Sequence, residues 1–268
     1  MQKQPVGIFD SGFGGLEVFR EIEKALPFYD YVYLGDTARA PYGSRSQKEI
    51  YKFTSQAVNF LFEKGCVLVI LACNTASSEA LRKIQQNFSD KKVLGVLIPA
   101  AEAAASLTAS KKVGVIATQG TINSGAFLRE LKKLDQSIVV YPQACPLLVP
   151  LIESGQENSK ELTLALEGCL KPLMDKKIDT LILGCTHYGL IEDKIRQMVP
   201  KEVKIISEGR VVAEKLKDYF KRHSEIESKI TRNCSIEFLT TGHLDKFNKI
   251  GSRFFKDEIR AQKVDIQQ

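Results

Sequence analysis

Residues 69–77 read Val-Ile-Leu-Ala-Cys-Asn-Thr-Ala-Ser, and residues 181–188 read Leu-Ile-Leu-Gly-Cys-Thr-His-Tyr. Each stretch is an apolar run followed by a small residue, a cysteine and hydrogen-bonding side chains. An apolar run that ends in turn chemistry predicts a buried strand of a parallel sheet. Ligands bind beyond the carboxyl ends of such strands. We therefore expect Cys73 and Cys185 at that edge, one in each half of the molecule, facing one substrate from opposite sides.

The chain on either side repeats one order of elements. Apolar runs that predict strands alternate with amphipathic segments that predict helices, which is typical of βαβ units and a parallel sheet. The two cysteines lie 185 − 73 = 112 residues apart, so we predict two similar α/β halves in tandem. One more strand, 236–240, must join one of the two sheets, and the pattern leaves open which. The eight strands expected in the two halves are 6–9, 31–34, 69–72, 93–98 (closing at Pro99), 113–118, 138–141, 181–185 and 203–206.

Composition indicates a globular protein. The chain has 268 residues, 44% of them hydrophobic and 26% charged, with a net charge of +6. That charge helps to attract a small anion, but the basic residues are spread out, so nucleic acid is not expected as the main ligand. No apolar run reaches the roughly 18 residues of a membrane helix, and no signal peptide precedes the first strand. We expect a cytoplasmic protein without a membrane span.

The cysteines themselves predict neither a disulfide framework nor a metal site. None of the six forms a C-x-x-C pair, and disulfides are not expected in a cytoplasmic chain of this size. His187 follows Cys185 at a spacing that zinc sites do not use, and the remaining histidines lie far along the chain. We therefore expect no metal. The cysteines are Cys66, Cys73, Cys145, Cys169, Cys185 and Cys234.

A glycine-rich stretch follows the first strand. Residues 10–15 read Asp-Ser-Gly-Phe-Gly-Gly and lead into a helix. The glycines let backbone amides approach a ligand at the helix start, where an anion is favoured. The spacing is not G-x-G-x-x-G, so a dinucleotide site is weakly supported. An alternative is that Asp10 only caps the helix.

Two mirrored thiols favour one reaction over its rivals. A nucleophilic cysteine enzyme needs one thiol, and a dithiol redox enzyme usually carries C-x-x-C. Inversion at one carbon uses two: a thiolate removes a proton from one face and a thiol delivers one to the other. Asp10 and His187 could hold the thiols in opposite protonation states. The alternative is that Cys73 and Cys185 are small buried core residues.

Six blocks of the chain, in order, resemble the signature blocks of bacterial glutamate racemases. The resemblance spans residues 7 to about 210 and is only general beyond them. Three departures affect loops: Gly189 replaces a proline, Ala100 follows Pro99 where glycine is usual, and Ser207-Glu208-Gly209 stands where Asp-Ser-Gly is common. The blocks are 10–16, 41–43, 72–77, 120–122, 144–153 and 184–188.

The resemblance implies interconversion of L- and D-glutamate without a cofactor, which supplies D-glutamate for peptidoglycan. It implies two α/β domains with the active site in the cleft between them, one formed by 1–98 plus 208–268 and the other by 99–207. The last strand would then join the first sheet. It carries the catalytic thiols onto Cys73 and Cys185, and the assisting acid–base groups onto Asp10, Glu153 and His187. Substrate contacts fall on Asp10, Ser11, Tyr42, Gly43, Asn74, Thr75, Thr186 and His187.

Three alternative functions are also compatible with the sequence. A racemase of the same superfamily could act on aspartate, because side-chain length is a property of the pocket. A binding protein for amino acids would carry the thiols incidentally, and an interaction protein would use the basic tract 215–232. A homodimer is considered, although the sequence itself carries no signal for the oligomeric state.

Overall fold

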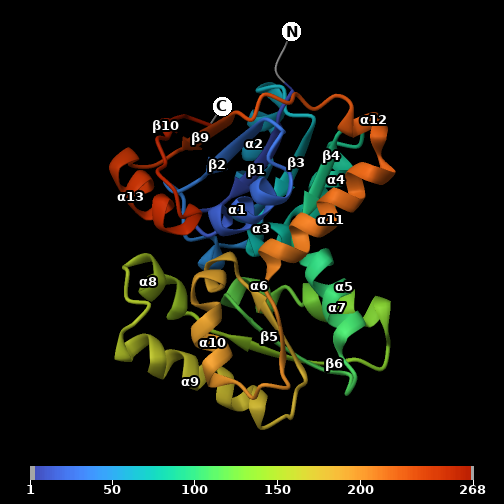
Figure 1. The fold of residues 1–268 in the computed structure, drawn as a ribbon, viewed down its shortest axis with the longest axis vertical. Coiled ribbons are helices and arrows are strands. Elements are labelled where there is room, and N and C mark those ends of the chain that lie inside the picture. Colours follow the sequence, from blue (N-terminus) through green and yellow to red (C-terminus); the bar gives the residue numbers. More distant parts are fainter. Residues whose placement is uncertain (1–3, 267–268) are drawn as a thin grey trace.

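The computed structural model describes residues 4–266, and its strands form two parallel sheets, one in the upper and one in the lower part of Figure 1. The larger sheet has the order β10-β9-β2-β1-β3-β4 and the smaller has the order β6-β5-β7-β8. The order 2-1-3-4 therefore recurs as 6-5-7-8, which confirms the two similar halves. The larger sheet consists of β1 (Val6–Asp10), β2 (Tyr31–Gly35), β3 (Leu68–Leu71), β4 (Lys92–Gly95), β9 (Ile236–Thr240) and β10 (Gln262–Lys263). The smaller consists of β5 (Lys112–Ala117), β6 (Val139–Ala144), β7 (Thr180–Gly184) and β8 (Lys204–Ile206).

We call the larger sheet with its helices the first lobe. Its first helix buries Leu16, Phe19 and Ile22 against the sheet, where Phe19 contacts the rings of Tyr31 and Tyr33. The helix that starts at Gln47 begins at a capping box formed by Ser46 and Glu49. The helices are α1 (Gly15–Ala25), η1 (Tyr42–Ser44), α2 (Gln47–Glu63), α3 (Asn74–Glu79), α4 (Leu81–Asn87), α11 (Glu208–Arg222), α12 (Ser224–Glu227) and α13 (Leu244–Phe255).

The smaller sheet with its helices is the second lobe. Near its start, Gly125 takes a left-handed conformation (φ 63°) and separates two short helices, Gln119–Asn123 and Ala126–Leu134. The helices are α5 (Leu97–Leu107), α6 (Gln119–Asn123), α7 (Ala126–Leu134), α8 (Leu148–Glu153), α9 (Lys160–Met174), η2 (Thr186–Ile191) and α10 (Glu192–Met198).

The end of the fourth strand was predicted incorrectly. The strand was expected to run to Ile98 and close at Pro99, but β4 ends at Gly95 and α5 begins at Leu97. Pro99 lies in the first turn of α5, where a helix tolerates proline because the missing N–H would have no intrahelical partner. Of the apolar residues that resembled the end of a strand, Leu97 is buried on that helix, whereas Ile98 is exposed.

The last long strand, β9, pairs with β2 in the first sheet, which confirms the placement that the resemblance implied. The chain therefore returns to the first lobe after β8. The division of the chain at 98/99 and 207/208 stays a prediction. Within residues 4–266, no helix has the length and apolar character needed to cross a membrane.

The expectation that the cysteines form no disulfide is wrong for one pair. Cys145 and Cys169 are joined, with their Cα atoms 6.0 Å apart. The bond links the residue after β6 to the buried face of α9. The prediction was based on compartment and motif, whereas the pairing depends on which elements pack together.

Candidate active site

The two thiols lie where the parallel-sheet argument placed them. Cys73 follows β3 and Cys185 follows β7, so each is at the carboxyl end of the strand next to the first strand of its sheet. Both side chains are buried, with 6% of each residue exposed. They are among the cysteines that carry a free thiol. The fold therefore gives each lobe one buried thiol at the equivalent position.

Cys73 is the N-cap of α3, and its sulfur accepts a hydrogen bond from the backbone N–H of Ala76 at 3.5 Å. The Ser11 hydroxyl lies 3.2 Å from the same sulfur. Burial and the nearby charge of Asp10 raise the pKa of the Cys73 thiol to about 12, although the hydrogen bonds with Ser11 and Ala76 act in the opposite direction. Without a further positive charge, Cys73 is therefore a protonated thiol at neutral pH.

Asp10 ends β1 and is fully enclosed. Its Oδ2 accepts the Gly12 N–H at 2.7 Å and so stabilises the turn before α1, but the N-cap of α1 is Gly14, without a side-chain cap hydrogen bond, so Asp10 is not the helix cap. Gly15 allows this packing, because a Cβ there would lie 2.5 Å from the Asp10 Cβ. Burial raises the pKa of Asp10 above its ordinary value, and the nearby His187 opposes that effect.

Cys185, His187 and Glu153 form a chain of side-chain contacts at the edge of the second lobe's sheet. The His187 Nδ1 lies 3.7 Å from the Cys185 sulfur, and the Nε2 lies 3.0 Å from a carboxylate oxygen of Glu153. Burial alone would lower the pKa of His187, but the interactions with Cys185 and Glu153 outweigh it and raise the pKa to about 10. His187 is therefore an imidazolium at neutral pH, although it is 6% exposed.

The two sheet edges meet directly. Gly14 in the first lobe contacts the Thr186 hydroxyl and the His187 ring so closely that a Cβ could not fit between them. On the other side of the junction, the Thr75 hydroxyl lies 3.1 Å from that of Thr118 and 3.3 Å from that of Thr121. These contacts join α1 to η2 and α3 to α6. Cys73 directly precedes Asn74 and Thr75, and Cys185 directly precedes Thr186 and His187, so each thiol is close in sequence to residues of this junction.

Asn74, the first residue of α3, is held by a residue that the site prediction did not include. Its Nδ2 donates a hydrogen bond to Glu208 at 2.5 Å, and both side chains are buried. Burial raises the pKa of Glu208 well above its ordinary value, and the Asn74 bond opposes this effect. The departure at Ser207-Glu208 was the sequence signal for this contact, although its consequence could not be inferred.

Tyr42 and Gly43 were expected to contact the substrate together, but they lie differently. The Tyr42 hydroxyl donates to Asp36 at 2.5 Å, and its ring packs against Phe9 in the first-lobe core. Gly43 lies at the junction, where its Cβ position would be 3.1 Å from Thr118. The backbone of η1 therefore reaches the junction, while the Tyr42 side chain packs into the core of the first lobe and bonds to Asp36.

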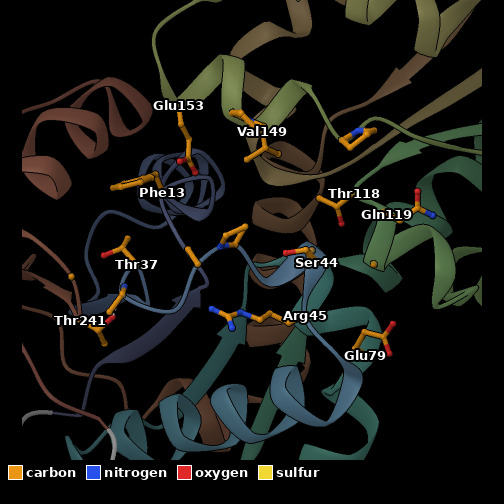
Figure 2. Close-up of a pocket in the computed structure, with 18 of the residues that line it drawn as sticks. Phe13, Thr37, Ser44, Arg45, Glu79, Thr118, Gln119, Val149, Glu153 and Thr241 are labelled. Carbon is orange, nitrogen blue, oxygen red and sulfur yellow. Dashed lines mark hydrogen bonds between the residues drawn. The ribbon is translucent and has the colours of Figure 1, made fainter.

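A pocket of about 1050 Å³ opens between the lobes. Figure 2 shows Phe13, Ser44 and Arg45 on the first-lobe side and Glu153 and Thr118 on the second-lobe side. Neither Cys73 nor Cys185 lines it, whereas Gly43 and Thr118 of the junction do. Within the described range 4–266, no group of three or more His, Cys, Asp or Glu side chains is placed to hold a metal ion.

Similarity to known proteins agrees with this geometry. A sequence profile described as Asp/Glu/Hydantoin racemase matches residues 6–216. The glutamate racemase of Thermoanaerobacter pseudethanolicus is 40% identical over all of this chain and 99% of its own length. A glutamate racemase isoform from Bacillus anthracis has a similar structure, with a TM-score of 0.92, 36% identity and coverage of 99% and 98%. Glutamate racemase from Francisella tularensis, solved with D-glutamate, has a TM-score of 0.91, 32% identity and coverage of 100% and 99%. The chain belongs to the Asp/Glu/Hydantoin racemase family.

Proposed function

We propose that the chain is a glutamate racemase, an isomerase that interconverts L- and D-glutamate and supplies the D enantiomer for peptidoglycan. The observation that carries this proposal is the pair of buried thiols at equivalent strand ends of two lobes that meet. Full-length similarity to glutamate racemases supports glutamate as the substrate. The reaction would run in the cytoplasm, and a homodimer stays an expectation.

The two thiols would act as the acid and base on opposite faces of the α carbon. Cys185 removes the α proton of L-glutamate as a thiolate, and Cys73 delivers a proton to the other face as a thiol. The pKa of about 12 supports a protonated Cys73 at the start of this direction. His187, with a pKa of about 10, places a cation 3.7 Å from the sulfur where the Cys185 thiolate is required. In the reverse direction the two roles exchange.

The site also offers acceptors for the substrate's ammonium group. Among the described residues, Asp10 Oδ1 and Asn74 Oδ1 are buried polar atoms without a hydrogen-bond partner. Glu208 holds the Asn74 Nδ2, which leaves the Oδ1 to accept. Buried acceptors require a donor, and an ammonium group supplies three. Its positive charge next to Asp10 would also favour the thiolate form of Cys73 during the reverse reaction.

The hydroxyls of Ser11, Thr75 and Thr186 and the backbone of Gly43 surround this position and are proposed to bind the carboxylates. Ser11 and Thr75 stand at the turns that follow β1 and β3, where backbone N–H groups at the start of a helix also favour an anion. Glu153 would act through His187, because its carboxylate contacts that ring.

A chiral assay of the purified chain with L-glutamate and with L-aspartate, without added cofactor, tests this function. D-glutamate should accumulate until the two enantiomers are equal, and L-aspartate should be turned over far more slowly. In heavy water, the recovered glutamate should carry deuterium at the α carbon. Binding without deuterium exchange would show a binding protein, and faster turnover of aspartate would assign the chain to the other substrate.

A further inference from the structure

A residue of the C-terminal segment, beyond the 6–216 match, reaches across to the second lobe. Arg253 on α13 donates from Nη2 to the backbone oxygen of Ile152 at 3.0 Å and from Nη1 to that of Glu153 at 3.3 Å. Its guanidinium also forms an ion pair with Glu157. In Figure 1, α13 lies directly beside α8, although about a hundred residues separate them in the sequence.

The two carbonyls are those of the last two residues of α8. The Ile152 carbonyl also accepts the Gly155 N–H at 3.1 Å, and the guanidinium adds a donor to both carbonyls and complements the negative end of the helix. Gly155 follows the helix end with φ +80°, a conformation that favours glycine, and a Cβ there would make only an ordinary contact with Arg253 Nη1, at 3.7 Å. Arg253 therefore fixes the position and direction of the helix end that carries Glu153.

The next residue of α13 contacts the partner of Glu153. The ring of Phe254 meets the His187 ring edge-on, with centroids 5.2 Å apart and planes at 83°. The backbone oxygen of Phe254 accepts a buried hydrogen bond from Arg20 Nη1 at 3.0 Å, which ties the end of α13 to α1. Two consecutive residues thus hold the backbone of Glu153 and the ring of His187 from the same rigid element.

We propose that Arg253 is a positioning residue that sets the Glu153–His187 pair next to Cys185, and so prepares the base on the L face alone. This inference rests on the proposed racemase function and its assignment of one thiol to each face. Cys73 is held by different groups, Ser11 and Ala76. Loss of Arg253 should therefore affect the two faces of the substrate unequally.

Elimination from the two enantiomers of 3-chloroglutamate separates the faces. One thiolate removes the α proton, chloride leaves from Cβ, and the resulting dehydroamino acid takes up water to give 2-oxoglutarate and ammonium. The reaction needs no proton return, so the rate reports one base for each enantiomer. Arg253→Gln should lower kcat/KM for the L form about tenfold, equivalent to about 1.4 kcal/mol, and change that for the D form less than about twofold.

Three comparison variants test what causes the loss of elimination from the L form. Arg260→Gln removes an exposed arginine of the same segment that pairs only locally with Glu258, and it should change neither rate. Arg253→Lys keeps the charge without the fork that spans two carbonyls, so it should restore the L rate only in part. In a Glu153→Gln background, Arg253→Gln should cause little further loss, because both changes act on the same contact with His187.

The D-form rate serves as the internal measure of correct folding. Equal losses on both faces, no loss at all, or full additivity with Glu153→Gln would each overturn the positioning role. Failure of the underlying function has a different result. In that case wild-type protein would not racemise glutamate, or the Cys73→Ser and Cys185→Ser variants would not differ between the enantiomers.

Discussion

The contact of Gly14 with the second lobe gives the sharpest prediction. Gly14 has φ −59° and ψ −37°, which alanine adopts without strain, so Gly14→Ala adds only a methyl group. That methyl would lie 2.8 Å from the His187 Cε1 and closer still to its Nδ1 and to the Thr186 hydroxyl. Because carbon atoms in contact are about 3.5–4.0 Å apart, the His187 ring, or the lobe that carries it, must move by about 0.7 Å or more.

Two costs follow from this displacement. Overpacking of a buried site should lower the free energy of unfolding by about 1–3 kcal/mol. A shift of about 1 Å in His187 should also lower kcat/KM for racemisation about 10²-fold, because acid–base catalysis depends on geometry. Racemisation followed by circular dichroism and unfolding in urea measure the two effects separately.

Gly168→Ala is the matched control. Gly168 lies on α9, where a Cβ would have no neighbour within 4 Å. The change should leave racemisation unaltered and stabilise the chain by up to about 1 kcal/mol, because alanine is the better helix former. If Gly14→Ala kept activity within about threefold of wild type, the close approach of Gly14 to His187 would not belong to the catalytic arrangement.

Four further predictions concern the two thiols, His187 and the reaction without a cofactor. Cys73→Ser and Cys185→Ser should each lower the rate of racemisation by several powers of ten, where each power of ten corresponds to about 1.4 kcal/mol of activation free energy. Cys73→Ser should still eliminate chloride from L-3-chloroglutamate, and Cys185→Ser from the D form. Elimination from both enantiomers by either variant would disprove the assignment of one thiol to each face. An NMR titration of the His187 ring protons should give a pKa of about 10 in wild type and a lower pKa in Glu153→Gln, which removes the charge of the carboxylate. Because the folded pKa of His187 exceeds its ordinary 6.5, the stability that its protonation adds is complete below pH 6.5 and is lost as the pH rises through about 10. The free energy of unfolding of wild type should therefore fall relative to that of His187→Gln across this interval. A difference in free energy that stays constant with pH would refute the raised pKa. Dialysis against a chelator should leave activity intact and reveal no pyridoxal phosphate absorbance, whereas activity restored by a metal or that cofactor would overturn the two-thiol mechanism.

The local sequence pattern was sufficient to predict the position of a residue wherever that position depends on the strand that precedes it. The runs before Cys73 and Cys185 predicted buried strands, and the repeat of 112 residues predicted matching sheets, because periodicity and turn chemistry act over a few residues. The same reasoning failed at Pro99, since an apolar run followed by proline fits either a strand end or the first turn of a buried helix.

The sequence by itself determined two α/β halves with a thiol at the same strand end of each. Only the tertiary structure decided what surrounds those thiols: Glu208 on Asn74, the disulfide between Cys145 and Cys169, and Arg253 on the end of α8. These contacts join residues 24 to 134 positions apart in the chain. No local pattern encodes them, because they exist only once separate elements have packed and their polar groups must find partners away from water.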